Sequence, residues 1–268
     1  MIMEYFMLIA VLIFIVAVAM TMVGKGGGNF YVLILAMASI SMHEAAATGQ
    51  FILFSASIAA MIIFQKNKSV SWQLAAIVGI LTALAAFGGG FLSHLFSGFT
   101  LKIIFAGMLC VAGIVMLIPV SEKKTLEESR HWNYVSFTSG GRIYSINMLI
   151  VVPITLLTGF GSGMVGVSGG SFLVPLMVLA AGVPMHTAVG TASILIAATA
   201  LMGFAGHAFN GDFNPALALP LAAVTILGGI LGGKLALKSK PKNLKRIFAF
   251  TNWLAAGMMV VNAVMALR

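Results

Sequence analysis

Residues 161–172, GSGMVGVSGGSF, interrupt a long apolar stretch of the chain with glycines and small hydroxyl residues. A second run of this kind, VGKGGGNF, occupies residues 23–30 near the N-terminus. Glycine adopts backbone conformations that other residues avoid, and it lets other chain segments approach closely. A helix that begins just after such a run directs unpaired backbone N–H groups into the gap. We therefore predict that each glycine run breaks a helix and forms part of a ligand site.

The composition of the chain places these breaks inside a membrane protein. Of the 268 residues, 60% are hydrophobic and 8% are charged, whereas soluble domains carry about 25% charged residues. The apolar runs approach the length of about 20 residues that crosses a bilayer as a helix. They lack the short alternating pattern of a membrane barrel. The sequence predicts an all-α polytopic protein of the cell (plasma) membrane.

Charge and cysteine content narrow the classes of partner. The formal net charge is +9, but the basic residues fall in loops beside apolar segments, where membrane topology and lipid headgroups account for them. Nucleic acid is therefore not an expected partner. Cys110 is the single cysteine, which excludes an internal disulfide and a thiolate metal cluster. We expect no cofactor and no metal, and the oligomeric state, including a homo-oligomer, stays open.

The two halves of the chain repeat each other. Three stretches of the first half align with three of the second, in the same order and in nearly one register. The aligned pairs are 23–32 with 165–174, 42–50 with 185–193, and 101–106 with 244–249. We predict a first transmembrane repeat at 1–120, a polar linker at 121–145 and a second transmembrane repeat at 146–268.

Each repeat is predicted to contain five apolar segments, the second of them too short to span a bilayer. The predicted segments are 2–23, 30–40, 51–64, 72–95 and 101–118, then 146–165, 172–181, 187–209, 215–237 and 247–267. A polar stretch at 41–50 is predicted to interrupt the first repeat between its second and third segments.

An odd number of crossings in each repeat would give the two repeats opposite orientations. The basic loops 65–71 and 238–246 lie at non-equivalent positions, and their counterparts 207–213 and 93–100 contain no Lys or Arg. Placing basic loops in the cytoplasm also puts the linker 121–145 there and both termini outside. If the short segments only enter the membrane and return, the number of crossings becomes even, and the sequence leaves this alternative open.

The glycine runs supply the main candidate binding residues. Ser171 is predicted to cap a helix that begins at Phe172, and Asn29 to cap one that begins at Phe30. Two positive helix N-termini that face one point would favour an anion. The candidate residues are Lys25, Gly26, Gly27, Gly28, Asn29, Ser168, Gly169, Gly170 and Ser171. Close packing of helices through small residues is the structural alternative.

Two charged residues distinguish the first repeat. Lys25 lies inside the first glycine run, where it would add a full positive charge to an anion site, or it would extend to the membrane surface. Glu44 is the only acid within the apolar parts of the repeats, away from their ends and long loops. We assign it as a candidate for proton coupling or as a partner of Lys25.

Matched histidines and threonines follow the short segments. His43 and His186 align with each other, as do Thr48 and Thr191, and all four are candidate substrate-binding residues because histidine and hydroxyl groups can bind anions. For the two histidines, a role at helix starts or at the membrane surface is an equal alternative. His207 falls near a predicted helix end and is interpreted as interfacial.

At these residues the chain resembles the TauE/SafE-type sulfite exporter family. The strongest resemblance covers residues 159–174, GFGSGMVGVSGGSFLV, and continues through Pro175, Leu176, Gly182, Ala188, Gly190, Thr191 and Ala192. The first glycine run departs from the family pattern because Leu33 replaces a proline and because Lys25 and Glu44 stand among small residues. The resemblance implies secondary transport of small anions, often sulfur-containing ones.

The predicted function is a carrier that exports or exchanges a small anion by alternating access, with protons as a candidate coupling ion. Sulfite, sulfonates and sulfoacetate are the expected substrates from the resemblance. The alternatives are a cation-coupled carrier for another substrate and an anion channel. An enzyme is not expected, because the sequence offers no convincing set of nucleophile and base.

Overall fold

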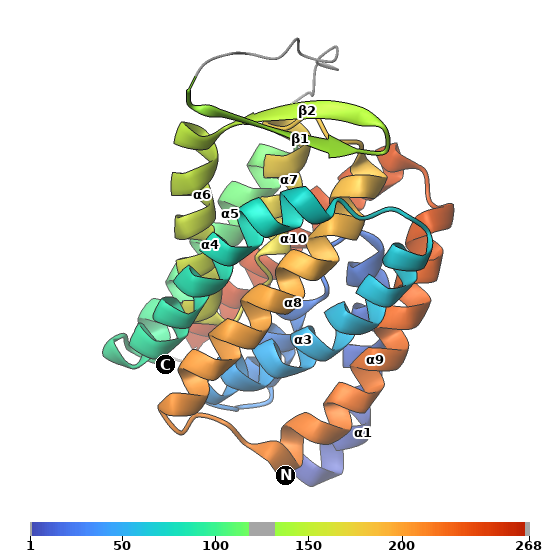
Figure 1. Ribbon diagram of the computed structural model, residues 1–268. Helices are drawn as coiled ribbons and strands as arrows, with labels where there is room; N and C mark the ends of the chain where they lie inside the picture. Colours follow the sequence, from blue (N-terminus) through green and yellow to red (C-terminus); the bar gives the residue numbers. More distant parts are fainter. Residues whose placement is uncertain (1, 118–131, 266–268) are drawn as a thin grey trace.

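The computed structural model describes residues 2–117 and 132–265, and these form a helical bundle with one β-hairpin (Figure 1). The first half of the chain contains α1 (Ile2–Met22), α2 (Gly28–Met37), α3 (Met42–Lys66), α4 (Trp72–Leu92), the short 3-10 helix η1 (Ser93–Leu95) and α5 (Gly98–Leu117). The second half contains β1 (Tyr134–Ser139), β2 (Arg142–Asn147), α6 (Met148–Val165), α7 (Gly170–Leu179), α8 (Met185–Phe209), α9 (Pro215–Lys238) and α10 (Pro241–Met265).

The helices confirm the predicted membrane class. Among the described residues, six are long and apolar enough to cross a bilayer, namely α3, α4, α5, α6, α8 and α9. The short helices α2 and α7 have 10 residues each, which corresponds to about 15 Å, or half of a hydrocarbon core. Both follow a glycine run, so the two predicted breaks are present.

The polar stretch 41–50 does not interrupt the first repeat as predicted, because α3 already begins at Met42. The Ser41 hydroxyl accepts a hydrogen bond from the backbone N–H of Glu44 and caps the helix. The following residues, EAAAT, are mostly good helix formers. Polar residues here therefore mark the N-terminal turns of a 25-residue helix.

The β-hairpin is the second departure from the predicted architecture. It forms the C-terminal part of the predicted linker 121–145 and leads into α6, and residues 121–131 of that linker lie outside the described residues. Gly140 and Gly141 form its turn with φ values of 57° and 75°, the conformation that two-residue hairpin turns require. The backbone N–H of Thr138 donates to the Gln73 side chain at the start of α4 (2.7 Å). The hairpin therefore covers one end of the bundle (Figure 1).

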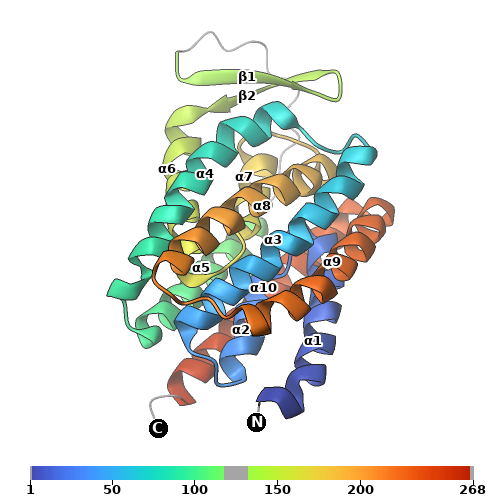
Figure 2. The ribbon, with the colours of Figure 1, turned by 60° about the horizontal axis from the view of Figure 1, so that its bottom comes forward.

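Each long helix of one half packs either against its counterpart in the other half or against a partner that is equivalent in the aligned repeats. α3 packs against α8, and the two run in opposite directions (Figure 2). Near the N-terminus of α3, Glu44 contacts Asn214 beyond the C-terminus of α8. Near the N-terminus of α8, Thr191 contacts Ser71 beyond the C-terminus of α3. α5 likewise packs on its counterpart α10. α1 packs on α9, and the counterparts of these two helices, α6 and α4, pack on each other in the same way.

Basic side chains gather at the hairpin end of the bundle. Lys66, Lys234 and Lys238 line a groove of about 1070 Å³ between α3 and α9. Part of the predicted basic loop 238–246 is helical, because α9 ends at Lys238 and α10 begins at Pro241. In contrast, α1 begins and α10 ends at the opposite end (Figure 2). The positive-inside rule predicts that the hairpin end faces the cytoplasm.

Cysteine labelling tests this orientation. In a Cys110→Ala background, Ser136→Cys places a thiol on the exposed surface of β1, and Leu95→Cys places one at the exposed opposite end. We expect a membrane-impermeant maleimide to label the Ser136→Cys protein only in inside-out vesicles. The Leu95→Cys protein should be labelled only in intact cells, and the reverse pattern would show that the hairpin lies outside.

Candidate functional site

The two glycine breaks meet at the centre of the bundle, and we call residues 24–29 and 166–171 the break junction. The side-chain nitrogen of Asn29 donates to the Ser171 hydroxyl (2.9 Å), and the Asn29 side-chain oxygen accepts from the backbone N–H of Ser168 (3.0 Å). A Cβ atom at Gly170 would lie 2.5 Å from the backbone oxygen of Gly24. The first turns of α2 and α7 therefore touch, with residues 142 positions apart in contact.

The predicted helix caps are wrong, because α2 begins at Gly28 and α7 at Gly170, two residues earlier than expected. The residues at the cap positions are Gly27 and Gly169, and neither helix has a side-chain cap from its cap residue. Gly27 has a left-handed φ of 101°, which glycine adopts readily. Asn29 and Ser171 thus lie inside the first turns, where their side chains link the two halves of the chain.

Lys25 is buried in the break junction, with 1% of its surface exposed. Its ammonium donates to the Thr251 hydroxyl (2.8 Å) and to the Asn252 side-chain oxygen (2.6 Å), both on α10. Asn252 also accepts from Asn29 (3.3 Å). Lys25 therefore does not extend to the membrane surface, and α10 contributes two residues that the sequence analysis missed.

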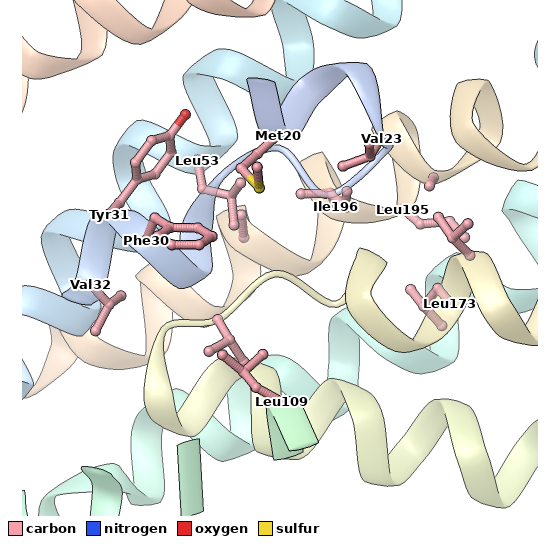
Figure 3. Close-up of a cluster of buried hydrophobic side chains, with 14 of the residues drawn as sticks. Met20, Val23, Phe30, Tyr31, Val32, Leu53, Leu109, Leu173, Leu195 and Ile196 are labelled. Atoms are coloured by element: carbon pink, nitrogen blue, oxygen red, sulfur yellow. The ribbon is translucent and has the colours of Figure 1, made fainter. Parts of the chain in front are cut away.

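The equivalent position in the second half is apolar. Val167 occupies the place of Lys25 in the aligned repeats, while Met108 and Leu109 of α5 correspond to Thr251 and Asn252 of α10. Leu109 is fully buried and lies beside the second break (Figure 3). Three residues thus change together, so one side of the break junction is polar and charged and the other is hydrophobic.

The break junction is closed to solvent. Asn29, Ser168 and Ser171 are at most 2% exposed. Buried apolar side chains lie around the two breaks (Figure 3), including Met20, Val23, Leu53, Leu109, Leu173 and Ile196. Buried polar atoms normally have partners. Yet the Asn252 side-chain nitrogen and the hydroxyls of Thr21 and Ser57 have no hydrogen-bond partner within the described part of the chain.

The long helices hold the breaks in place through equivalent contacts. A Cβ atom at Gly24 would lie 3.1 Å from the Cα atom of Val189 on α8, and one at Gly166 would lie 2.6 Å from the Cα atom of Ala46 on α3. Val189 and Ala46 correspond to each other in the aligned repeats. Each break is therefore seated on the long helix of the other half.

The matched threonines have different environments. The Thr191 hydroxyl accepts a hydrogen bond from the backbone N–H of Ser71 (2.9 Å) at the start of α4. Its hydrogen bond is therefore to α4 and not to the glycine breaks. The Thr48 hydroxyl is fully buried and has no hydrogen-bond partner within residues 2–117 and 132–265. The hydrogen bonds of the break junction include neither residue.

The candidates His43, His186 and Glu44 lie in the first turns of α3 and α8, at their N-termini. His43 contacts the backbone oxygen of Ser93 (3.4 Å), and the Glu44 carboxylate accepts from the Asn214 side chain (3.0 Å). His186 is half-buried. Glu44 therefore does not pair with Lys25, which binds α10 instead.

His207 is buried rather than interfacial, which corrects its sequence-based interpretation. It is 0% exposed and contacts the backbone oxygen of Gly163 (2.9 Å) near the end of α6. Its Nδ1 atom lies 3.2 Å from the Ser93 hydroxyl and 3.6 Å from the Asp212 carboxylate. No local pattern indicates this burial, because a histidine near a helix end is also typical of a membrane surface.

Comparisons with known proteins place these observations in a family. The profile of the sulfite exporter TauE/SafE family matches residues 9–259. The probable membrane transporter protein YunE of Bacillus subtilis is 23% identical over 252 residues, covering 90% of this chain and 92% of the relative. A probable membrane transporter protein of Methanocaldococcus jannaschii is 26% identical over 261 residues, covering 90% and 91%. No solved structure matches the chain significantly.

Proposed function

Because the chain belongs to the sulfite exporter TauE/SafE family, we propose that this membrane transporter carries small sulfur-containing anions, such as sulfite, sulfonates or sulfoacetate. We further propose that the break junction is its substrate site. The observation that carries the proposal is the contact between the N-termini of α2 and α7 beside the buried ammonium of Lys25.

Electrostatics at the break junction favour an anion. Each helix N-terminus carries a partial positive charge of about half a proton charge, and Lys25 adds an ammonium. The two α10 oxygens that accept from Lys25 belong to neutral side chains. The Asn252 side-chain nitrogen is a further buried donor without a partner in the described chain. An incoming anion would meet donors and positive charge on the side of the first break.

The buried state of the break junction supports a carrier rather than an open channel. An ion can enter only after the surrounding helices move, which alternating access provides. A cavity of about 740 Å³ lies between α5, α6 and α7 and reaches from Tyr134 and Asn147 at the hairpin end to Phe172. Phe172 directly follows Ser171, so this cavity is the proposed approach from the hairpin side.

The inverted arrangement of the repeats is part of the same proposal. Contact between antiparallel α3 and α8, and the exchange of partners between α1, α9, α6 and α4, are what two repeats of opposite orientation would produce. Such a design would bring equivalent residues together near the midplane, and the contact between Asn29 and Ser171 supports it.

Transport by purified protein in liposomes tests the proposed function. We expect saturable uptake of radiolabelled sulfite and sulfoacetate, and faster uptake when the liposomes contain unlabelled anion, because a carrier exchanges substrate across the bilayer. Protein-free liposomes give the background. Uptake that never saturates and shows no counterflow would support the channel instead. If both anions fail and uptake of another solute depends on sodium, the cation-coupled alternative is correct.

A further inference from the structure

A second polar cluster lies at the end of the bundle opposite the hairpin, and it comprises His43, Ser93, His207 and Asp212. We infer that His207 and Asp212 form a proton-binding site that couples proton movement to transport. This inference rests on the proposed carrier function, and it assigns coupling to a different place from Glu44.

The hydrogen-bond partners of His207 can accept hydrogen bonds from both ring nitrogens. The Nε2 atom lies 2.9 Å from the Gly163 backbone oxygen, which can only accept. The Nδ1 atom faces the Ser93 hydroxyl at 3.2 Å, but that hydroxyl donates its single proton to the Gly90 backbone oxygen at 2.7 Å. In this hydroxyl orientation both nitrogens face acceptors, and we assign to His207 the form that donates from both, which carries a positive charge.

Asp212 supplies the matching negative charge. Its Oδ2 atom is buried, has no hydrogen-bond partner in the described chain and lies 3.6 Å from the Nδ1 atom of His207. His207 also lies in the last turn of α8, where the helix dipole stabilises a cation. The carboxylate side chain of Asp212 is 22% exposed. It thus connects a fully buried imidazole to the solvent-exposed end of the bundle, so protons can reach and leave the pair.

The site is linked to the break junction through α6. The backbone oxygen of Gly163 belongs to the last turn of α6, where carbonyl groups lack partners within the helix. The second break begins directly after this turn, at Gly166. If His207 loses one proton, only one ring nitrogen can donate. Either the Gly163 carbonyl or the Ser93 hydroxyl then loses the hydrogen bond that His207 donates, so proton release alters the packing of α8 at the end of α6, next to the break junction.

The neighbouring titratable side chains contact groups other than His207 and Asp212. On α3, His43 contacts the Ser93 backbone oxygen (3.4 Å) and Glu44 binds Asn214. On η1, His94 is exposed and contacts the Phe91 backbone oxygen (2.7 Å). α6 presents the Gly163 carbonyl to His207, and a carbonyl does not titrate. Asp212 is the charged group that directly faces the buried imidazole among the described residues.

Nitrogen NMR of labelled histidine tests the charge of the pair without any transport measurement. In the full-length protein in nanodiscs at neutral pH, we expect the His207 signal to show both nitrogens protonated. Loss of that signal in His207→Gln protein assigns it. Asp212→Asn removes the negative charge and is expected to convert His207 to the singly protonated form, whereas His94→Gln should leave the His207 signal unchanged. A singly protonated His207 in the unsubstituted protein, or no response to Asp212→Asn, would overturn the inference.

Proton movement in liposomes tests the coupling. Sulfoacetate is the probe, because it does not itself take up a proton near neutral pH. We expect a sulfoacetate gradient to drive proton flux through the unsubstituted protein. In Asp212→Asn protein we expect at least about a tenfold lower proton flux per anion, while sulfoacetate counterflow continues, because the substitution removes the negative charge that lies 3.6 Å from the Nδ1 atom of His207.

The result separates this inference from the proposed function. If the unsubstituted protein shows no anion counterflow, the proposed function fails, and the NMR result still reports whether the pair is charged. If counterflow occurs with no proton flux, or if Asp212→Asn keeps the proton flux of the unsubstituted protein, the carrier stands and the coupling site is wrong. His94→Gln protein is the matched control, and it is expected to retain both fluxes.

Discussion

Gly170→Ala is expected to destabilise the folded protein by roughly 1–3 kcal/mol, whereas Gly169→Ala next to it is expected to have little effect. A Cβ atom at Gly170 would lie 2.5 Å from the Gly24 backbone oxygen and 2.6 Å from the Ile196 Cδ1 atom. One contact is with backbone of the other break, which cannot move aside without separating the two short helices. At Gly169 the nearest atom would lie at 3.4 Å, an ordinary van der Waals distance.

The two variants also separate the effect of a steric clash at Gly170 from the effect of removing any glycine from the run. Both remove one glycine from the same run. Gly169, the cap residue before α7, has right-handed helical backbone, and Gly170 is the first residue of α7. Thermal unfolding in detergent, followed by tryptophan fluorescence and size-exclusion chromatography, measures the stability difference. Anion counterflow in liposomes is expected to fall sharply in Gly170→Ala protein and to survive in Gly169→Ala protein. Equal effects of the two substitutions would show that close contact between the breaks is not required.

Lys25→Met is expected to lower anion transport by about 10- to 100-fold, because hydrogen bonds to a charged group contribute about 1.5–3 kcal/mol. Methionine has a similar length and fills the same apolar surroundings, but it removes the positive charge and both donors to α10. Initial rates of sulfoacetate uptake over a range of concentrations measure the effect. Lys66→Met, at an exposed position on α3, removes one positive charge elsewhere and should transport normally.

The second half of the chain supplies a stricter control. Lys25→Val, Thr251→Met and Asn252→Leu together install the three residues that the aligned repeat carries as Val167, Met108 and Leu109. This triple variant is expected to remain folded, because it replaces a buried polar set with an apolar set of the kind already present in the fold. Transport should nevertheless be lost. Retained transport in the triple variant would remove Lys25 and α10 from the substrate site.

Most of the helical architecture could be predicted from the sequence, because apolar runs and glycine breaks are local signals. The prediction failed where a polar stretch has two local interpretations. Residues 41–50 resemble a loop in composition, but Ser41 caps a helix that contains the rest. In the linker, Gly140 and Gly141 separate two strands of six residues each, and the Gly-Gly pair is a turn signal that the predicted architecture did not include.

The candidate site shows the same limit for contacts distant in sequence. The glycine runs located the break junction, because they change the backbone wherever they occur. Thr251 and Asn252 could not be assigned to it, since they approach Lys25 only when α10 packs in the bundle, 226 and 227 residues away in sequence. His207 was misassigned for the same reason, because its burial depends on α6 and η1 and not on its own helix.

The one-sided chemistry of the break junction bears on the energies of the two access states. In a carrier built from two inverted repeats with identical residues, exchanging the conformations of the repeats would interconvert outward-facing and inward-facing forms of equal free energy. Here Lys25 meets Thr251 and Asn252 on one side, whereas Val167 lies with Met108 and Leu109 in the corresponding positions. Under the proposed alternating access, opening one side would expose an ammonium to water and opening the other would expose hydrocarbon, so the empty transporter would have a preferred resting direction.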